Sequence, residues 1–247
     1  MLKKYFKQIF IMIFLIFSVV LTAEDNFMAV GNIKIVRPEP LLIKREDLNI
    51  TIEKDSTIKV ESMYTFSNLG EYNIKSTFMF WLDQTRENDN KDPNNSNKNN
   101  KGKYIKNIKF YSDYKKSQNL RAVIKFDENI YENQSVGNIQ REWFAISKTI
   151  PSKEEGKLGV YYDLQNTGFN RTKKFVYSFD LVSNFSEKNK VEILYINVYN
   201  KSGRKIDSIV YRDYEFKNLT GKKSDKEHYE LLVSNVNLDE KLVIKFK

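Results

Sequence analysis

Residues 58–66 have the sequence IKVESMYTF, in which apolar and polar side chains alternate. One side of an extended chain would carry Ile58, Val60, Ser62, Tyr64 and Phe66, and the other side Lys59, Glu61, Met63 and Thr65. Alternation with a period of two predicts a strand with one buried face. Residues 48–52 and 74–82 show the same pattern, and Asn68-Leu69-Gly70 predicts a turn before the later strand.

Further along the chain, the same alternation recurs with turn residues between the segments. The expected strands lie at residues 108–111, 120–126, 143–146, 158–164, 175–181, 191–199, 206–211, 229–233 and 242–246. About eleven to thirteen short strands without helical periodicity predict an all-β fold, an antiparallel β-sandwich. Residues 84–103 contain seven Asn and no apolar residue, which predicts a disordered loop at which the chain could also divide into two subdomains.

The first residues have the composition of a secretory signal. Lys3, Lys4 and Lys7 precede an apolar run from Ile9 to Leu21, and Ala23 suits a cleavage site. The run is shorter than the roughly 20 residues of a spanning helix, so cleavage is favoured over an uncleaved anchor. Residues 1–23 are therefore predicted to be a signal peptide and residues 24–247 a single exported domain without a transmembrane helix, either periplasmic or secreted to the cell surface.

Composition excludes several classes of chemistry. The chain has no cysteine, which excludes disulfides and thiolate metal sites, and His228 is its only histidine. It has no nucleotide-binding or nucleophile motif. A net charge of +9 spread over 247 residues shows no nucleic-acid footprint. We therefore expect no enzyme, no cofactor, no metal and no nucleic-acid partner.

Aromatic residues provide the candidate binding site. The chain has 15 Tyr and 17 Phe. Tyrosines exposed on a β face can stack on sugar rings or peptides, whereas buried ones fill the core and pair across strands. The candidate ligand-binding residues are Tyr161, Tyr162, Tyr177, Tyr195 and Tyr199.

Two stretches together resemble a family of exported bacterial proteins known as a domain of unknown function. The first stretch runs from Glu46-Asp47-Leu48-Asn49-Ile50 through VESMYTFSN at 60–68 to FMFWL at 78–82. The second is YEL at 229–231 followed by NLDEKLVI at 237–244. Trp81-Leu82 and Asn237 stand where the family has prolines. The resemblance implies an extracytoplasmic β-rich domain and supplies neither an activity nor site residues.

These features favour a non-catalytic, extracytoplasmic module that binds an envelope protein or a surface glycan. Two alternatives stay open. A small outer-membrane β-barrel would also have alternating strands, with an apolar band toward lipid. An envelope glycan hydrolase would need two carboxylates facing each other across a cleft, which sequence spacing cannot show.

Overall fold

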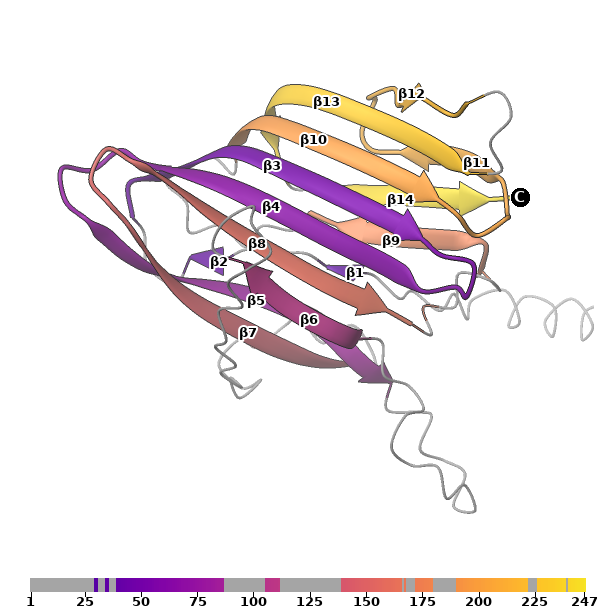
Figure 1. Cartoon of the computed structure of the whole chain (residues 1–247), viewed down its shortest axis with the longest axis horizontal. Helices are drawn as coiled ribbons and strands as arrows, with labels where there is room; N and C mark the ends of the chain where they lie inside the picture. Colours follow the sequence, from indigo (N-terminus) through magenta and orange to yellow (C-terminus); the bar gives the residue numbers. More distant parts are fainter. Residues whose placement is uncertain are drawn as a thin grey trace, which may run out of the picture.

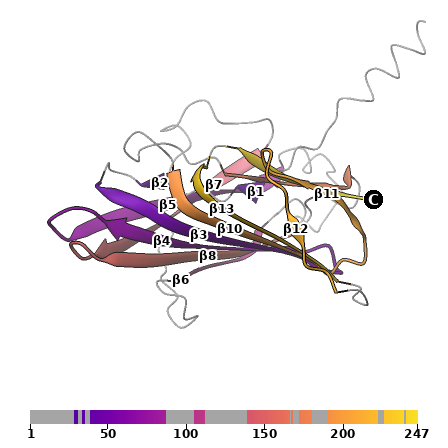
Figure 2. The same ribbon diagram turned by 90° about the horizontal axis from the view of Figure 1, so that it is seen from above.

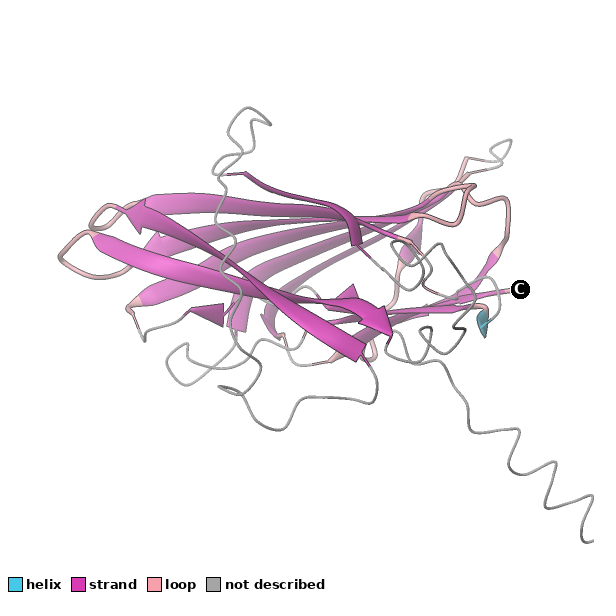
Figure 3. Ribbon diagram, turned by 90° about the horizontal axis from the view of Figure 1, so that it is seen from below, coloured by secondary structure: helices cyan, strands magenta, loops and turns pink. Residues whose placement is uncertain are grey.

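The computed structural model describes residues 29–30, 34–35, 39–86, 105–111, 139–165, 167, 172–179, 190–221, 226–238 and 240–247. Nearly all of this part of the chain is β-strand (Figure 3). The strands are β1 (Ala29–Val30), β2 (Lys34–Ile35), β3 (Leu41–Ile52), β4 (Ile58–Asn68), β5 (Ile74–Arg86), β6 (Ile105–Tyr111), β7 (Ile139–Ile150), β8 (Glu155–Leu164), β9 (Lys174–Ser178), β10 (Lys190–Asn200), β11 (Ile206–Val210), β12 (Lys217–Asn218), β13 (Glu227–Asn237) and β14 (Lys241–Phe246).

The strands form three open sheets arranged in two layers. A seven-stranded sheet has the order β12-β13-β10-β3-β4-β8-β6 (Figure 1). A four-stranded sheet, β1-β9-β14-β11, and a three-stranded sheet, β2-β5-β7, lie together on one side of it (Figure 2). The predicted all-β, sandwich-like fold is thus confirmed.

The core fills the space between the layers because each long strand buries one face. Leu48, Ile50 and Ile52 of β3 are fully buried, while the residues between them are half-buried. The same cluster contains Phe175 from the four-stranded sheet and Phe78 from the three-stranded sheet. Burial of a large apolar side chain contributes about 2 kcal/mol, so packing of this kind can hold a cysteine-free domain together.

The large sheet departs from a purely antiparallel arrangement at its centre. β3 pairs with β4 antiparallel, but its other edge pairs with β10 in parallel over most of the length of both strands. The short pair β1–β9 is also parallel. Alternation with a period of two is the same in both pairing directions, which is why the sequence did not reveal these pairs.

The boundaries of several predicted segments can be compared with the structure. β5 continues to Arg86 because residues 82–86 pair with residues 139–142 of β7, so the predicted loop begins three residues later than expected. The rest of that loop, the predicted strand at 120–126 and the predicted signal peptide at 1–23 lie outside the described residues. The large sheet takes strands from both sides of the loop, namely β3 and β4 before it and β6, β8, β10 and β13 after it.

Candidate functional site

The large sheet turns one face toward the smaller sheets and the other away from them (Figure 2). Strand register places the residues of five neighbouring strands in three rows on the side turned away. We call this set the outer face: Leu232, Tyr195, Asp47, Met63 and Gly159; Glu230, Asn197, Asn49, Glu61 and Tyr161; His228, Tyr199, Thr51, Lys59 and Asp163. Neighbouring strands lie about 4.8 Å apart, so the outer face is roughly 19 Å wide.

Tyr195 is held in one orientation by two neighbours, Glu230 and Arg45. Its hydroxyl donates a hydrogen bond to Glu230 Oε2 at 2.6 Å. The guanidinium of Arg45 lies 5.7 Å from the ring centroid and is itself paired with Asp47, at 2.7 Å between Nη2 and Oδ1. The bond to Glu230 is the main reason why the pKa of Tyr195 is raised. The half-buried ring therefore presents a fixed surface at the outer face.

A chain of polar side chains crosses the next two rows. Asn197 Nδ2 donates to Asn49 Oδ1 at 3.1 Å, and Asn197 Oδ1 lies 3.0 Å from His228 Nε2. Because Asn197 Oδ1 can only accept, Nε2 of His228 must carry the proton. The imidazole stacks on the ring of Tyr199, with centroids 4.4 Å apart and planes 19° from parallel. This stack and the two amides combine a flat aromatic surface with hydrogen-bonding groups.

Tyr161 of β8 is the third tyrosine of the outer face. Its hydroxyl donates to Asp163 Oδ1 at 2.5 Å, and Asp163 Oδ2 accepts from Asn107 Nδ2 at 2.7 Å. Burial first, and then the bond to Asp163, raise the pKa of Tyr161. The phenol therefore stays neutral and acts as a hydrogen-bond donor at physiological pH.

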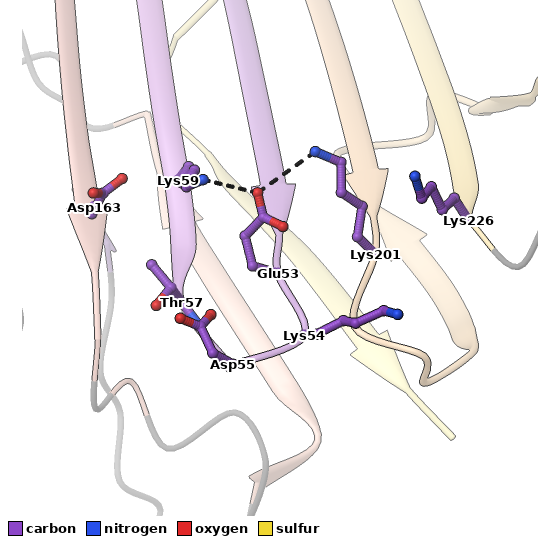
Figure 4. A pocket seen from close by; sticks show the side chains of 8 residues that line it. All are labelled: Glu53, Lys54, Asp55, Thr57, Lys59, Asp163, Lys201 and Lys226. Carbon is purple, nitrogen blue, oxygen red and sulfur yellow. Dashed lines mark hydrogen bonds and ion pairs between the residues drawn. The ribbon is translucent and has the colours of Figure 1, made fainter.

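A pocket of about 600 Å³ adjoins the outer face at the β3–β4 hairpin (Figure 4). Its lining consists of Glu53, Lys54, Asp55, Thr57, Lys59, Asp163, Lys201 and Lys226. Glu53 Oε1 lies between two ammonium groups, 3.0 Å from Lys59 Nζ and 3.6 Å from Lys201 Nζ. We call this the lysine pocket.

The five predicted tyrosines divide between two environments. Tyr161, Tyr195 and Tyr199 share the outer face, as the binding hypothesis requires. Tyr162 and Tyr177 point into the core, with exposures of 1% and 0%, so a ligand at the surface cannot reach them. Tyr162 follows Tyr161 directly, and successive side chains on a strand point to opposite faces.

Sequence reasoning missed the polar members of this site. His228, the only histidine of the chain, is half-buried and hydrogen-bonded to Asn197. Asn49 and Asn197 are 148 residues apart and become neighbours only through the parallel β3–β10 pair. Each of the two asparagines lies between buried residues of its strand, so alternation placed both side chains on the outward side. Nothing in the sequence indicated that β3 and β10 are neighbours in the sheet.

A buried acid lies on the opposite side of the same sheet. Glu46 is 1% exposed and accepts a hydrogen bond from Ser62 Oγ at 2.8 Å. Burial raises its pKa to about 7, partly offset by the hydrogen bonds of Ser62 and Tyr64. Because Glu46 faces the core, we treat it as part of the internal structure rather than of the surface site.

Among the residues that the structure describes, no group of three or more His, Asp or Glu side chains is placed to hold a metal ion. The same part of the chain contains no helix long and apolar enough to cross a membrane.

These features define an all-β, sandwich-like protein with an aromatic and polar face on its larger sheet. The chain matches no protein-family model and no curated protein. Its fold is similar to that of a proposed nutrient-binding protein from Legionella pneumophila, with a TM-score of 0.57 and 11% identity over 88% of this chain and 72% of that one.

The chain is also similar to two peptidase structures. A proposed protease from Parabacteroides distasonis gives a TM-score of 0.49 at 8% identity, and covers 84% of this chain and 40% of that chain. An M1 zinc metallopeptidase from Deinococcus radiodurans gives 0.42 at 9% identity, with 83% and 42% covered. The present chain thus spans about two fifths of these two proteins, and at such identities the likeness concerns the fold.

These similarities correct one prediction from the sequence. The absence of catalytic motifs led us to expect that the chain is not an enzyme. Chains of peptidases are among those with a similar arrangement of strands. Absent motifs therefore do not exclude catalysis for a chain of this architecture, and that exclusion is withdrawn.

Proposed function

We propose that this chain is an exported binding module whose outer face binds an uncharged stretch of a surface glycan. The observation that carries the proposal is the combination, on one face, of oriented aromatic rings with amide and carboxylate groups. The C–H bonds of a sugar ring pack against an aromatic ring, as Tyr195 and Tyr199 would allow. Sugar hydroxyls both donate and accept hydrogen bonds, which the half-buried Asn49, Glu61 and Glu230 can match.

The rigidity of the outer face supports this proposal. Tyr195 is fixed by Glu230 and Arg45, and Tyr199 is stacked on His228. Side chains that are already ordered lose less conformational entropy when a ligand binds. A site of this kind can bind a weakly interacting ligand such as a sugar chain.

Charge and apolar content favour a neutral glycan over the other partners considered from the sequence. The outer face has four acidic side chains and one lysine, and the basic residues Arg45, Lys109 and Lys217 lie at its edges, so its charges are nearly balanced although the chain as a whole carries +9. A nearly neutral surface offers little attraction to nucleic acids or polyanionic glycans. Among the described residues, the large exposed apolar side chains on this face are Leu232, with Ile193 beside it, and Leu219 at the edge next to His228, which is little for the centre of a protein interface.

The proposal is tested by co-sedimentation of the purified protein with insoluble chitin, cellulose, xylan and peptidoglycan. We expect at least one of them to bind the protein, and the variants Tyr195→Ala and Tyr199→Ala to lose most of that binding. Tyr72→Ala is the matched control, because Tyr72 is 57% exposed and lies in the β4–β5 turn, away from the outer face. Equal binding by all three variants, or no binding to any polysaccharide, would contradict the proposal.

A further inference from the structure

We propose that the lysine pocket binds one anionic group, a carboxylate or a phosphate, carried by the ligand that lies on the outer face. The ligand would then be a glycan with uncharged units over the tyrosines and an acidic group at the β3–β4 hairpin. Only the glycan part rests on the function proposed above. The anion site itself rests on the geometry of the pocket.

The pocket directly continues the outer face. Side chains two residues apart on a strand share a face. Lys201 follows Tyr199 by two residues, Glu53 follows Thr51 by two, and Lys226 precedes His228 by two. These three therefore form the next row beyond His228, Tyr199 and Thr51, so one ligand can contact the rings and the pocket together.

Positive charge prevails in the pocket, in contrast to the outer face. Lys54, Lys59, Lys201 and Lys226 contribute four positive charges, against three acidic side chains. A single carboxylate, that of Glu53, lies between the ammonium groups of Lys59 and Lys201. Figure 4 shows the ammonium group of Lys226 on the side of Lys201, whereas Asp163 lies beyond Lys59 on a neighbouring strand.

The other two acids of the pocket are engaged by other groups. Asp163 accepts hydrogen bonds from Tyr161 and Asn107. Asp55 Oδ1 accepts from the backbone N–H of Thr57 at 3.0 Å and so stabilises the hairpin turn, in which Ser56 has a φ of 69°. Neither carboxylate lies beside Lys201 and Lys226, on the side of the pocket toward β10 and β13 (Figure 4).

The lysines are accessible to a ligand. The side chains of Lys59 and Lys201 are 42% and 40% exposed, and Glu53 is 23% exposed. In the absence of a ligand, Glu53 acts as an internal competitor that occupies two ammonium groups. A bound carboxylate or phosphate would accept from Lys201 and Lys226 beside it, in charge-assisted hydrogen bonds.

If Glu53 competes with the anion, removing its charge should strengthen anion binding, whereas removing a lysine should weaken it. The probes are inorganic phosphate and glucuronic acid, with glucose as the neutral match, titrated into the purified protein at constant ionic strength. Binding is followed by NMR of the backbone amides of β10, β13 and the β3–β4 hairpin. We expect saturable shifts with phosphate, glucuronate or both, and none with glucose. Which anion binds distinguishes a phosphate-bearing from a uronic-acid-bearing ligand.

Variants of the pocket should then change the affinity in a predictable way. Each exposed charge contact contributes up to about 1 kcal/mol, or about fivefold in affinity. Glu53→Gln should tighten anion binding about fivefold, and Lys201→Met or Lys226→Met should weaken it by a similar factor. The controls are Glu71→Gln, which removes an exposed acid paired with Lys153, and Lys75→Met on β5.

Non-saturating shifts, or the same affinity in Glu53→Gln and Lys201→Met as in the controls, would overturn the anion site. The two proposals can fail independently. Tyr195→Ala and Tyr199→Ala should leave phosphate binding unchanged because neither ring lines the pocket. Loss of polysaccharide binding with intact anion binding would therefore refute only the glycan proposal.

Discussion

Glu46 makes the stability of the fold depend on pH. Burial raises its pKa to about 7 in the folded protein, from an ordinary value near 4.5. The folded state therefore binds more protons than the unfolded state between these two values, and stability falls as the pH rises through that window. A shift of this size corresponds to a loss of about 3 kcal/mol on going from pH 4 to pH 8.

The variant Glu46→Gln should lack this loss, because an amide does not ionise. The quantity to follow is the unfolding free energy of Glu46→Gln minus that of the parent protein. We expect this difference to increase by about 3 kcal/mol between pH 4 and pH 8, because only the parent loses stability. Urea unfolding followed by circular dichroism measures it. Glu71→Gln is the matched control for the substitution itself, since the Glu71 side chain is 85% exposed. A constant difference for Glu46→Gln would show that the carboxyl ionises normally in the fold.

Individual residues also show what the sequence can predict at this scale. Alternation correctly placed Tyr64 and Phe66 inside, and it separates Tyr161 from Tyr162 without any structure. Glu46 is two residues before Leu48 and therefore faces the core with it, although a carboxyl group is unusual there. The register shift between Ile43 and Arg45 lies before Glu46, and it allows Ile43, at an odd-numbered position, to be buried as well.

At the scale of elements, Asn68 joins two turns that connect the layers. The two N–H bonds of its buried Nδ2 are shared among the carbonyls of Tyr72, Ile150 and Pro151, at 2.8, 3.0 and 2.9 Å, and its Oδ1 accepts from Gly70 N–H at 2.8 Å. One amide therefore holds the β4–β5 turn against the β7–β8 turn, where both pairs of strands pass from one sheet to the other.

Asn68→Ala should destabilise the protein by about 3 kcal/mol, because it leaves several buried backbone groups without a partner. Asn73→Ala is the matched control in the same turn. Asn73 is exposed and accepts a single bond from Ser152 N–H, so its loss should cost less than about 1 kcal/mol. Thermal and urea denaturation provide both values. Equal effects of the two substitutions would argue against the role of Asn68 as the link between the turns.

The sequence predicted where the strands lie but not how they pair. Alternation locates β3, β4 and β10 and their buried faces, since it depends only on local positions. The partner and direction of a strand depend on contacts far apart in sequence, such as Asn49 with Asn197. The outer face exists only because of that parallel pair, so the sequence could supply Tyr195 and Tyr199 as candidates but not the site that they form with His228.

At the scale of the whole molecule, the core connects all three sheets. Phe66 of β4 packs against Phe78 of β5, with ring centroids 4.7 Å apart, and Phe175 and Tyr177 of β9 belong to the same buried cluster. The large sheet also uses strands from both sides of residues 84–103. The single domain predicted from the sequence stays a prediction, which unfolding experiments can test.

A single cooperative core should unfold in one step. We expect the unfolding curves from far-ultraviolet circular dichroism and from tyrosine fluorescence to coincide. Leu48→Ala, which removes a fully buried side chain from β3, should shift both curves together, with a loss of about 3 kcal/mol. Two separate transitions, only one of them affected by Leu48→Ala, would instead show that the chain divides into two independent units.

Glycan binding by the outer face is tested most directly by NMR of the protein labelled with ¹³C at its tyrosine rings. A polysaccharide-derived oligomer that binds the protein should shift the ring signals of Tyr195 and Tyr199. It should leave those of Tyr72 in its exposed turn, and of Tyr162 and Tyr177 in the core, at their original positions. Shifts confined to Tyr72 or to other surfaces, with Tyr195 and Tyr199 unperturbed in the bound protein, would contradict the account.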